Sequence, residues 1–360
     1  MKKILFLVGT RPEVIKIAPV LSACRQKHSF LSLLCTSGQH DCLLSDTLAD
    51  FALSPDYAFQ IVGDLAGKQC ECMRRFTEVL KKAAPHAVVV HGDTLTAFAG
   101  GLAAFYEGIP VFHVEAGLRT DTPFSPFPEE LYRRAIDHLS TLHFAPTAHA
   151  AERLLREGIR REGILTVGNT AIDGLLADID PAFIHPALTN GKKLVLVTLH
   201  RRESMGAPLA GMLRGIAAAL KGRADLSLFF PMHPNPALRN AAKAALSHLS
   251  CVTLAEPVDA HTFRNLLARA ALALTDSGGV SEEATALGTP TLLLRDETER
   301  PEGVEAGVLH LVGRERDAVR AAVADFLDTP RPHTPSSVFG DGHAAPRIAD
   351  AIEKFLCFQA

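Results

Sequence analysis

Carboxylate side chains follow two of the apolar runs in the first half of the sequence. Asp93 lies in the turn after the run at 87–90, and Glu115 comes directly after a second run that ends at Val114. Glu129 follows a short distance along the chain. Carboxylates are among the side chains that remove protons from substrates and return them. If these three acids converge on one rim, they form a set of acid–base groups.

Basic side chains accompany the first apolar run. It ends in the turn at 9–13, which contains Arg11, and Lys16 lies about one helical turn further on. Pro12 stands where proline favours the first turn of a helix. Backbone N–H groups at such a turn, together with two cations, can hold an anion.

Polar turns in the second half carry different chemistry. Two apolar runs are followed by His200 and His233. A third is followed by Asp-Ser-Gly-Gly at 276–279, which opens a predicted helix over 280–287. Small residues at this point let a diphosphate approach the N–H groups at the helix start; they are Ser277, Gly278 and Gly279.

Two further groups lie close to this turn in the sequence. Glu282 or Glu283, about one turn into the predicted helix, can accept hydrogen bonds from ribose hydroxyls. Arg295 and Arg300 follow the next apolar run. Together they favour a nucleotide site in the second half.

Each of these features also has an ordinary structural interpretation. A His-Gly-Asp turn is often only a capped strand end. The acids at 129 and 130 are residues that the first turn of any helix favours, and the arginines at 201 and 202 can be a solvated surface pair. The functional interpretation is favoured because all these groups lie at the same end of successive strands, where ligands bind in open α/β sheets.

The elements that must position these groups alternate between strand and helix. Short apolar runs are each followed by a turn and a stretch of helical periodicity, which is typical of parallel α/β units. Continuous runs such as 194–197 indicate strands that are buried on both faces. The predicted strands are residues 3–8, 31–36, 87–90, 110–114, 141–145, 164–166, 194–199, 227–231, 251–254, 271–275, 291–294 and 308–312.

The length of 360 residues and the 47% hydrophobic content favour two domains. Asp, Pro, Asn and Gly become frequent between Gly168 and Lys193, where the division is expected. We predict two Rossmann-like, doubly wound domains, residues 1–170 and 171–345, facing each other across a cleft. A C-terminal helix over 346–360 can pack back on the first domain.

Composition excludes several classes of function. The net charge of −3 and the pI of about 6.6 give no attraction to a polyanion, so no nucleic acid partner is expected. Seven scattered cysteines suggest neither a disulfide framework nor a metal site, and Cys70 and Cys72 lack the usual zinc spacing. Polar residues cut short the opening MKKILFLVG, so a buried strand is expected in place of a signal peptide or membrane segment. These features predict a cytoplasmic protein.

Familiar cofactor motifs are absent from the sequence. There is no GxGxxG after the first strand and no GxxxxGK[ST], so neither a usual NAD site nor a P-loop is predicted. The histidine and glutamate at 113 and 115 have the HxE spacing of zinc deaminases, but the partner PCxxC is missing. We therefore expect no cofactor and no metal.

Ten motifs in order along the chain resemble one family, the non-hydrolysing UDP-N-acetylglucosamine 2-epimerases. The motifs are GTRPEVIKIAPV at 9–20, SGQH at 37–40, HGDT at 91–94, HVEAGLRT at 113–120, PFPEE at 126–130, GNTAID at 168–173, HRRES at 200–204, DSGGVSEEA at 276–284, TERPE at 298–302 and GDG at 340–342. The resemblance implies a glycosyltransferase-B-like fold whose second domain binds UDP. The Pro-Glu pair after GTR is typical of the non-hydrolysing branch.

The activity that the resemblance implies is inversion of carbon 2 of UDP-N-acetylglucosamine, giving UDP-N-acetylmannosamine. In the family, UDP is expelled to leave 2-acetamidoglucal and then adds back, with a proton delivered to the opposite face. Family members are commonly homodimers, and the product serves surface polysaccharide synthesis.

The resemblance also assigns residues. Asp93, Glu115 and Glu129 match the family's acidic positions, and His200 matches its functional histidine. With Arg11, His200 is expected to stabilise charge on the departing diphosphate. The residues predicted to bind substrate are Arg11, Lys16, Arg133, His233, Ser277, Gly278, Gly279, Glu283 and Arg300.

The sequence departs from the family pattern at a few positions. Tyr132 stands where Asn is usual after PEE, and Ser281 replaces a common Gln. Asp41 and Cys42 follow QH where Arg-Glu is common, near a second, activating substrate site of bacterial members. Rival functions are epimerisation of a related UDP-sugar such as a 2,3-diacetamido uronate, a glycosyltransferase-B transferase, and a sugar-nucleotide sensor.

Overall fold

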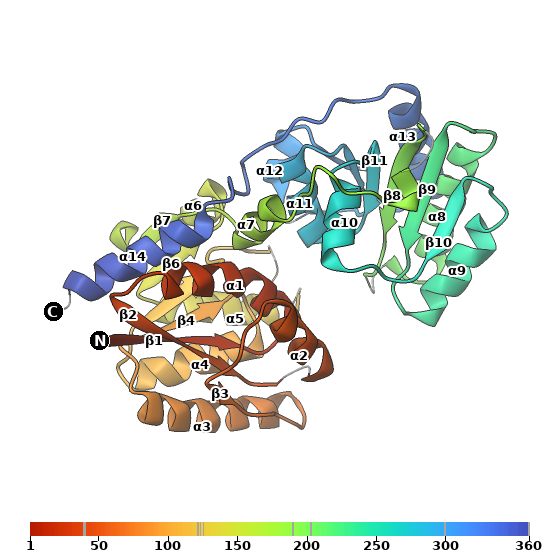
Figure 1. Ribbon diagram of the computed structural model, residues 1–360. Helices are drawn as coiled ribbons and strands as arrows, with labels where there is room; N and C mark the ends of the chain where they lie inside the picture. Colours follow the sequence, from red (N-terminus) through yellow and green to blue (C-terminus); the bar gives the residue numbers. More distant parts are fainter. Residues whose placement is uncertain are drawn as a thin grey trace. The chain divides into compact units, whose positions relative to one another are not determined.

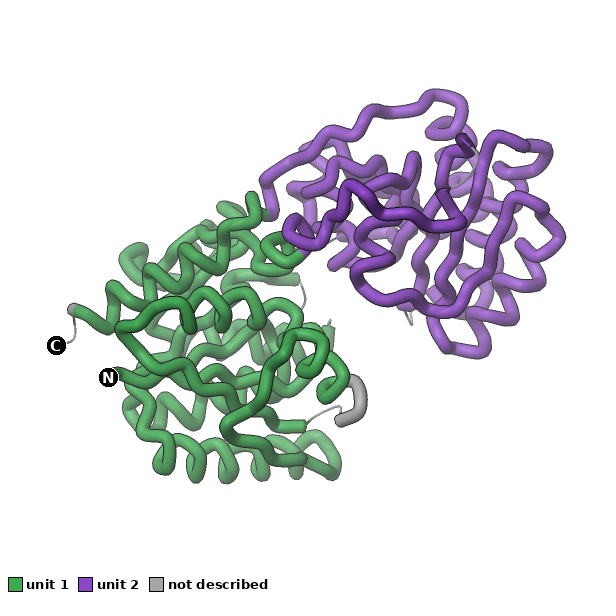
Figure 2. The backbone as a smooth tube through the Cα atoms, in the orientation of Figure 1, with its two compact units in different colours: residues 1–174, 340–360 green, residues 175–339 purple. Residues whose placement is uncertain are grey.

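The chain folds into two compact units. The computed structural model describes residues 1–38, 41–120, 122, 124, 126–188, 191–201, 204–298 and 300–358, without the side chains of 41–43 and 358. Unit 1 comprises residues 1–174 and 340–360, and unit 2 comprises residues 175–339 (Figure 2). The polypeptide therefore leaves unit 1, forms unit 2 and returns.

A parallel sheet forms the centre of unit 1. Within the described residues it has the strand order β3-β2-β1-β4-β5-β6-β7, the order of a doubly wound sheet. The strands are β1 (Lys2–Val8), β2 (Phe30–Thr36), β3 (Tyr57–Ala58), β4 (Ala87–His91), β5 (Val111–Val114), β6 (Leu142–Ala145) and β7 (Ile164–Thr166) (Figure 1).

Helices cover both faces of this sheet. They are α1 (Arg11–Arg25), α2 (Asp41–Asp50), α3 (Leu65–Ala83), α4 (Leu95–Tyr106), α5 (Glu129–Leu139), α6 (Ala148–Arg156), α7 (Thr170–Ala177), which continues into unit 2, and α14 (Ala344–Phe358). Side chains of β1 alternate between the two faces. Ile4 and Phe6 share a core with α1 and α14, whereas Leu5 and Leu7 share one with α3 and α4.

The C-terminal helix α14 belongs to the core of unit 1. Ile348, Ile352 and Leu356 recur at helical spacing and are buried in the core that contains β1 and α1. Burying each such side chain contributes roughly 1.5–3 kcal/mol. Asp173 in α7 accepts hydrogen bonds from the Ala344 and Ala345 N–H groups at the start of α14, at 3.1 and 2.6 Å. Residues next to both crossings between the units are thereby held in unit 1.

Unit 2 repeats the architecture with a parallel sheet in the order β10-β9-β8-β11-β12-β13 within its described part. Its strands are β8 (Lys193–Thr198), β9 (Leu226–Pro231), β10 (Val252–Ala255), β11 (Leu272–Thr275), β12 (Thr291–Leu293) and β13 (Leu309–Leu311). Its helices are α8 (Ala207–Leu220), α9 (Pro236–Leu246), α10 (Ala260–Leu267), α11 (Gly278–Leu287), α12 (Pro301–Glu305) and α13 (Arg316–Asp328). Figure 1 shows helices on both faces of this sheet as well.

The predicted fold class is confirmed as two parallel α/β units. Each of the twelve predicted strands is present and agrees with the structure within one residue at either end. The edge strand β3 was not predicted because two residues are too short to show a periodic pattern. The units divide after Gly174 and before Gly340. The sequence predicts these divisions after residues 170 and 345. The predicted cleft between the domains stays a prediction.

Glu13 joins two turns at the carboxyl ends of β1 and β4. One of its carboxylate oxygens accepts hydrogen bonds from the Gly9 N–H (3.0 Å) and the Thr10 hydroxyl (2.8 Å). The other accepts from the hydroxyl of Thr94 (2.8 Å), which is the N-cap of α4. Glu13 is 1% exposed, and burial raises the pKa of its carboxyl to about 7 against the opposing effect of these hydrogen bonds. The folded protein is therefore less stable when this carboxyl is ionised than when it is neutral.

Replacing Glu13 by Gln should change how the free energy of unfolding depends on pH. The ordinary pKa of 4.5 applies in the unfolded chain, so the wild-type contribution is fully present below that pH and is lost as pH rises through about 7. At about 1.4 kcal/mol per pKa unit, the loss amounts to about 3 kcal/mol. The Glu13→Gln variant keeps groups that can bond the same partners and lacks this loss.

Urea denaturation of both proteins at about pH 5 and about pH 8 measures the effect. The variant should gain about 2.5 kcal/mol on the wild type between the two pH values, because part of the loss has already occurred at pH 5. A difference between the two proteins that stays constant over this range would contradict the raised pKa of Glu13.

Candidate active site

Asp93 lies in the turn between β4 and α4 and pairs with a cation from α5. Its carboxylate forms an ion pair with the guanidinium of Arg133, which also lies 3.2 Å from Glu130 Oε2. Glu129 is the first residue of α5 and is half-buried. Arg133 follows Glu129 by four residues, so the two side chains leave the same face of the helix. The structure thus brings together Asp93 and Arg133, with Glu129 one turn away.

Glu115 directly follows β5 and lies between two basic side chains. Its carboxylate pairs with the ammonium of Lys16 from α1, and Oε2 is 3.3 Å from Nε2 of His91. Burial lowers the pKa of His91 to about 3, so this imidazole is neutral at neutral pH. Lys16, predicted to bind substrate, is therefore the cationic neighbour of a predicted catalytic acid. Arg11 is the exposed first residue of the same helix.

The backbone at Glu115 has an unusual conformation. Its φ is +68°, in the left-handed region that side chains other than glycine seldom adopt. Gly117, two residues on, has φ of +86°, and a Cβ there would lie 2.3 Å from the carbonyl oxygen of Ala150. The segment that carries Glu115 therefore bends sharply against α6, and glycine is required at 117.

Glu130, next to Glu129, has a structural role. It is fully buried and accepts hydrogen bonds from the Arg134 guanidinium (2.8 Å) and the Thr120 N–H (3.1 Å). With Arg133 nearby, its charge is balanced by two cations. Of the two adjacent acids, Glu129 is the one with exposed surface for a substrate.

Tyr132, which departs from the family pattern, packs in the core. Its ring stacks on Phe98 of α4 with centroids 4.9 Å apart and an angle of 14° between the planes, and it is 7% exposed. Burial raises the pKa of its hydroxyl, and the nearby charge of Glu129 adds to the rise. Packing between α4 and α5 thus accounts for an aromatic residue here without reference to the sugar.

In unit 2, Asp276 holds the turn that carries His200. Asp276 follows β11, is fully buried, and accepts hydrogen bonds from the N–H groups of His200 and Arg201, each at 3.1 Å. The His200 Nδ1 lies 3.6 Å from Asp276 Oδ1. The rings of His200 and His233 stack with centroids 6.5 Å apart. Two predicted histidines are therefore neighbours, with a buried carboxylate against one of them.

An arginine side chain lies against the start of α11, where the sequence predicts an anion site. Ser277 is the N-cap residue, and the helix begins at Gly278. A Cβ at Gly278 would lie 2.7 Å from the guanidinium carbon of Arg300, so Arg300 lies directly against the helix start. Arg300 Nε donates to Glu282 Oε1 at 2.7 Å. N–H groups of the first turn and a guanidinium together suit a diphosphate.

Glu283, predicted to bind ribose, is held by a buried arginine. Arg264 Nε donates to Glu283 Oε1 at 3.2 Å, and Nη1 of the same side chain donates to Asp178 Oδ2 at 3.3 Å. Arg264 is 8% exposed. The carboxylate of Glu283 is thus fixed in direction one turn into α11.

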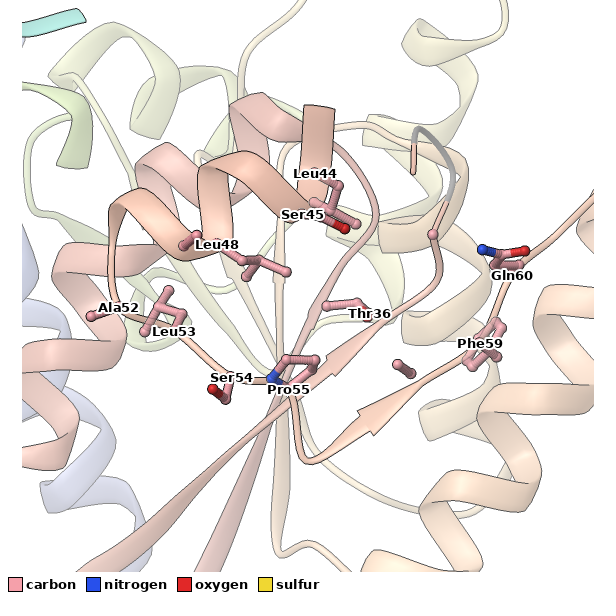
Figure 3. A pocket seen from close by; sticks show the side chains of 13 residues that line it. Thr36, Leu44, Ser45, Leu48, Ala52, Leu53, Ser54, Pro55, Phe59 and Gln60 are labelled. Carbon is pink, nitrogen blue, oxygen red and sulfur yellow. The ribbon is translucent and has the colours of Figure 1, made fainter. Parts of the chain in front are cut away.

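A separate pocket of about 750 Å³ lies in unit 1 between α2 and the ends of β2 and β3. Figure 3 shows apolar side chains such as Leu44, Leu48 and Phe59 around it, with Ser45 and Gln60 at its margin. None of the described residues that line it is charged, and none is a predicted site residue. It therefore does not suit a diphosphate.

Other expectations from the sequence concern metal sites, membrane spans and the positions that depart from the family pattern. Across the described ranges there is no cluster of three or more His, Cys, Asp or Glu side chains placed to hold a metal, and six cysteines are free thiols. None of the helices that the structure describes is both long and apolar enough to cross a bilayer. The side chains of Asp41 and Cys42, where the sequence departs from the family pattern, lie outside the described part of the chain. Residues 39 and 40 lie outside it as well.

Comparison with known proteins places the chain in a family. The family model described as UDP-N-acetylglucosamine 2-epimerase matches residues 22–353. The UDP-N-acetylglucosamine 2-epimerase of Bacillus subtilis (strain 168) is 40% identical over 359 residues, covering 97% of this chain and 94% of that protein.

Solved structures agree over the whole chain. A Listeria monocytogenes protein described as a putative UDP-N-acetylglucosamine 2-epimerase has a TM-score of 0.91 at 40% identity, covering 99% of this chain and 98% of that one. The Neisseria meningitidis UDP-GlcNAc 2-epimerase, solved bound to UDP-GlcNAc, has a TM-score of 0.89 at 36% identity, covering 98% and 100%.

A distant likeness extends the fold beyond epimerases. A spinosyn rhamnosyltransferase has a TM-score of 0.56 at 16% identity, covering 98% of this chain and 96% of that one, which shows a shared fold alone. The glycosyltransferase-B-like fold implied by the sequence motifs is thus confirmed. With the family model and a relative at 40% identity both spanning nearly its full length, the chain belongs to the UDP-N-acetylglucosamine 2-epimerase family.

Proposed function

We propose that this enzyme interconverts UDP-N-acetylglucosamine and UDP-N-acetylmannosamine by inverting carbon 2 of the sugar. The observation that carries the proposal is the set of acids in unit 1: Asp93 and Glu115 are each ion-paired at the end of a strand, and Glu129 begins α5 one turn before the partner of Asp93. Family membership supports the substrate, and the acids support the chemistry.

Elimination and re-addition is the proposed reaction. The carbon-2 hydrogen has no adjacent carbonyl to acidify it, so its removal is coupled to breakage of the bond between carbon 1 and the UDP oxygen. A carboxylate takes the proton, UDP leaves with the bonding electrons, and 2-acetamidoglucal remains. A proton then adds to the opposite face of carbon 2, and the UDP oxygen bonds carbon 1 again. Two faces require more than one acid–base group, which Asp93, Glu115 and Glu129 provide.

Unit 2 is proposed to hold the nucleotide. The N–H groups at the start of α11 and the guanidinium of Arg300 would bind the diphosphate, and Glu283 would accept hydrogen bonds from the ribose. His200 and Arg11 would stabilise the charge that develops on the departing UDP. His233, stacked beside His200, would contact the same group.

The wider setting follows from the resemblance. We propose a homodimer in the cytoplasm, with a product that supplies surface polysaccharide synthesis and with units that close over the intermediate. A glycosyltransferase would have no use for three acids at the sugar. No observation favours a uronate substrate, because Tyr132 is accounted for by its packing on Phe98.

The proposal is tested by proton NMR of UDP-N-acetylglucosamine with the purified protein in D₂O. We expect UDP-N-acetylmannosamine to form with deuterium at carbon 2, because the proton returned to carbon 2 comes from a group that exchanges with solvent. Neither product nor exchange, with turnover of a diacetamido uronate, would move the substrate assignment to that sugar. No turnover of any UDP-sugar without an acceptor would favour a transferase.

Substituting the acids one at a time separates their roles. Asp93→Asn, Glu115→Gln and Glu129→Gln should each lower kcat by about 10²–10⁴-fold, because each removes an acid–base group. Deuterium wash-in measured from each epimer separately shows which face a given acid serves. Glu107→Gln, at the far end of α4, is the matched control and should keep wild-type rates. An acid variant that turns over like this control is not part of the reaction.

Removing the cation at the start of α11 should weaken nucleotide binding. Arg300→Ala should lower the affinity for UDP about ten- to a hundredfold, since a hydrogen bond to a charged group is worth about 1.5–3 kcal/mol. Isothermal titration calorimetry with UDP measures the loss. Arg223→Ala, which removes an ion pair to Asp328 in the same unit, should bind UDP normally. Equal affinities for the two variants would place the diphosphate elsewhere.

A further inference from the structure

A buried aspartate in α5, Asp137, collects hydrogen bonds from the segment that carries Glu115. Its Oδ1 is 2.6 Å from Nδ1 of His113. Its Oδ2 accepts from the Arg119 guanidinium at 2.7 Å and from the Gly117 N–H at 3.3 Å. Asp137 and His113 are both fully buried. The acid thus binds three points of the chain between β5 and the turn beyond it.

His113 passes the connection on to the turn that carries Asp93. Its second ring nitrogen, Nε2, lies 2.7 Å from the carbonyl oxygen of Gly92. A carbonyl oxygen only accepts, so Nε2 donates. Burial alone would raise the pKa of Asp137, but the charges of and hydrogen bonds from His113 and Arg119 outweigh it and hold that pKa below its ordinary value. Asp137 is therefore an ionised acceptor, and the ring of His113 bridges it to the carbonyl of Gly92.

Arg119 extends this network to a second carboxylate. Arg119 pairs with Asp137 and also with Glu157, at 2.7 and 2.6 Å, so one guanidinium lies between two carboxylates. Such a buried ionic group often adds little net stability compared with apolar residues of the same volume. The network therefore contributes mainly to the positions of its residues, because each hydrogen bond fixes the direction of the next side chain.

Asp137 and His113 are connected to all three proposed acid–base residues, through a hydrogen bond to a neighbouring residue, along the chain or within a shared helix. Asp93 directly follows Gly92, whose carbonyl His113 holds. Glu115 lies between His113 and Gly117, in a left-handed conformation that costs roughly 1–2 kcal/mol and persists only where its surroundings impose it. Glu129 stands on α5, two turns before Asp137.

We propose that the hydrogen-bonded pair of Asp137 and His113 is the positioning element that holds the turns of Asp93 and Glu115 in register with Glu129. This proposal deepens the proposed function and rests on it. Asp137 and His113 do not touch the substrate; they act through the backbone of the turns that they bind. Misplacing acid–base groups by about 1 Å can cost about 10²-fold in rate.

His143 offers a matched control on the neighbouring strand. It pairs with His113 in the sheet, is 2% exposed, and places Nε2 2.6 Å from the carbonyl oxygen of Asp137 and Nδ1 3.2 Å from that of Gly163. It is about as buried as His113, but both of its ring nitrogens face backbone carbonyls, and neither holds a turn that carries a proposed acid.

The experiment compares Asp137→Asn, His113→Gln and His143→Gln with the wild type. Thermal melting measures stability, calorimetry measures UDP binding, and carbon-2 deuteration measures kcat and KM. We expect His113→Gln and His143→Gln to lower Tm by similar amounts. Only His113→Gln and Asp137→Asn should lower kcat, by about 10²-fold, while UDP affinity is kept and KM changes much less. A fall in kcat that tracks Tm across all three variants would reduce the pair to a structural role and overturn the proposal.

A measurement on the wild-type protein tests the pair without any variant. With ¹⁵N-histidine labelling and assignment of the His113 ring, NMR should show a proton on Nε2, because this nitrogen donates to the Gly92 carbonyl. A ring without a proton on Nε2 could not hold the Gly92 carbonyl and would overturn the proposal. The ring signal needs no substrate, so it can succeed even if wild-type deuteration fails and the proposed function is abandoned.

Discussion

Every candidate group in this protein depends on the parallel register of two sheets. In unit 1, β4 and β5 pair His91 with Val114, so the turns of Asp93 and Glu115 leave the sheet side by side. In unit 2, β8 and β11 pair Thr198 with Thr275, which places the turns of His200 and Asp276 next to each other. A slip of one residue would turn every side chain of a strand to the other face. The buried cores fix this register.

The two units solve the same positioning problem in the same way. In each, a fully buried aspartate accepts hydrogen bonds from backbone N–H groups of a functional turn: Asp137 from Gly117, and Asp276 from His200 and Arg201. A carboxylate suits this task because two oxygens offer several acceptor sites within a small volume. Groups held in place before a substrate arrives need no reorganisation during the reaction.

The sequence predicted the strands and most candidate groups because both follow from local pattern. Apolar runs mark buried strands, and polar residues directly after them mark one edge of a sheet. Local pattern could not separate Glu129 from Glu130, since both open the same helix and only tertiary contacts bury the second. It also missed Asp137 and the turn-joining role of Glu13, whose partners lie far along the chain.

The return of the chain to unit 1 has a consequence for the order of events during synthesis. Domains generally fold as the ribosome releases them, the N-terminal one first. Here the core of unit 1 contains Ile348, Ile352 and Leu356, so it is not complete until these residues have emerged, after all of unit 2. Unit 2 is continuous in sequence and has all its strands earlier. Unit 1, which carries the acids, is therefore completed after unit 2, although its synthesis begins first.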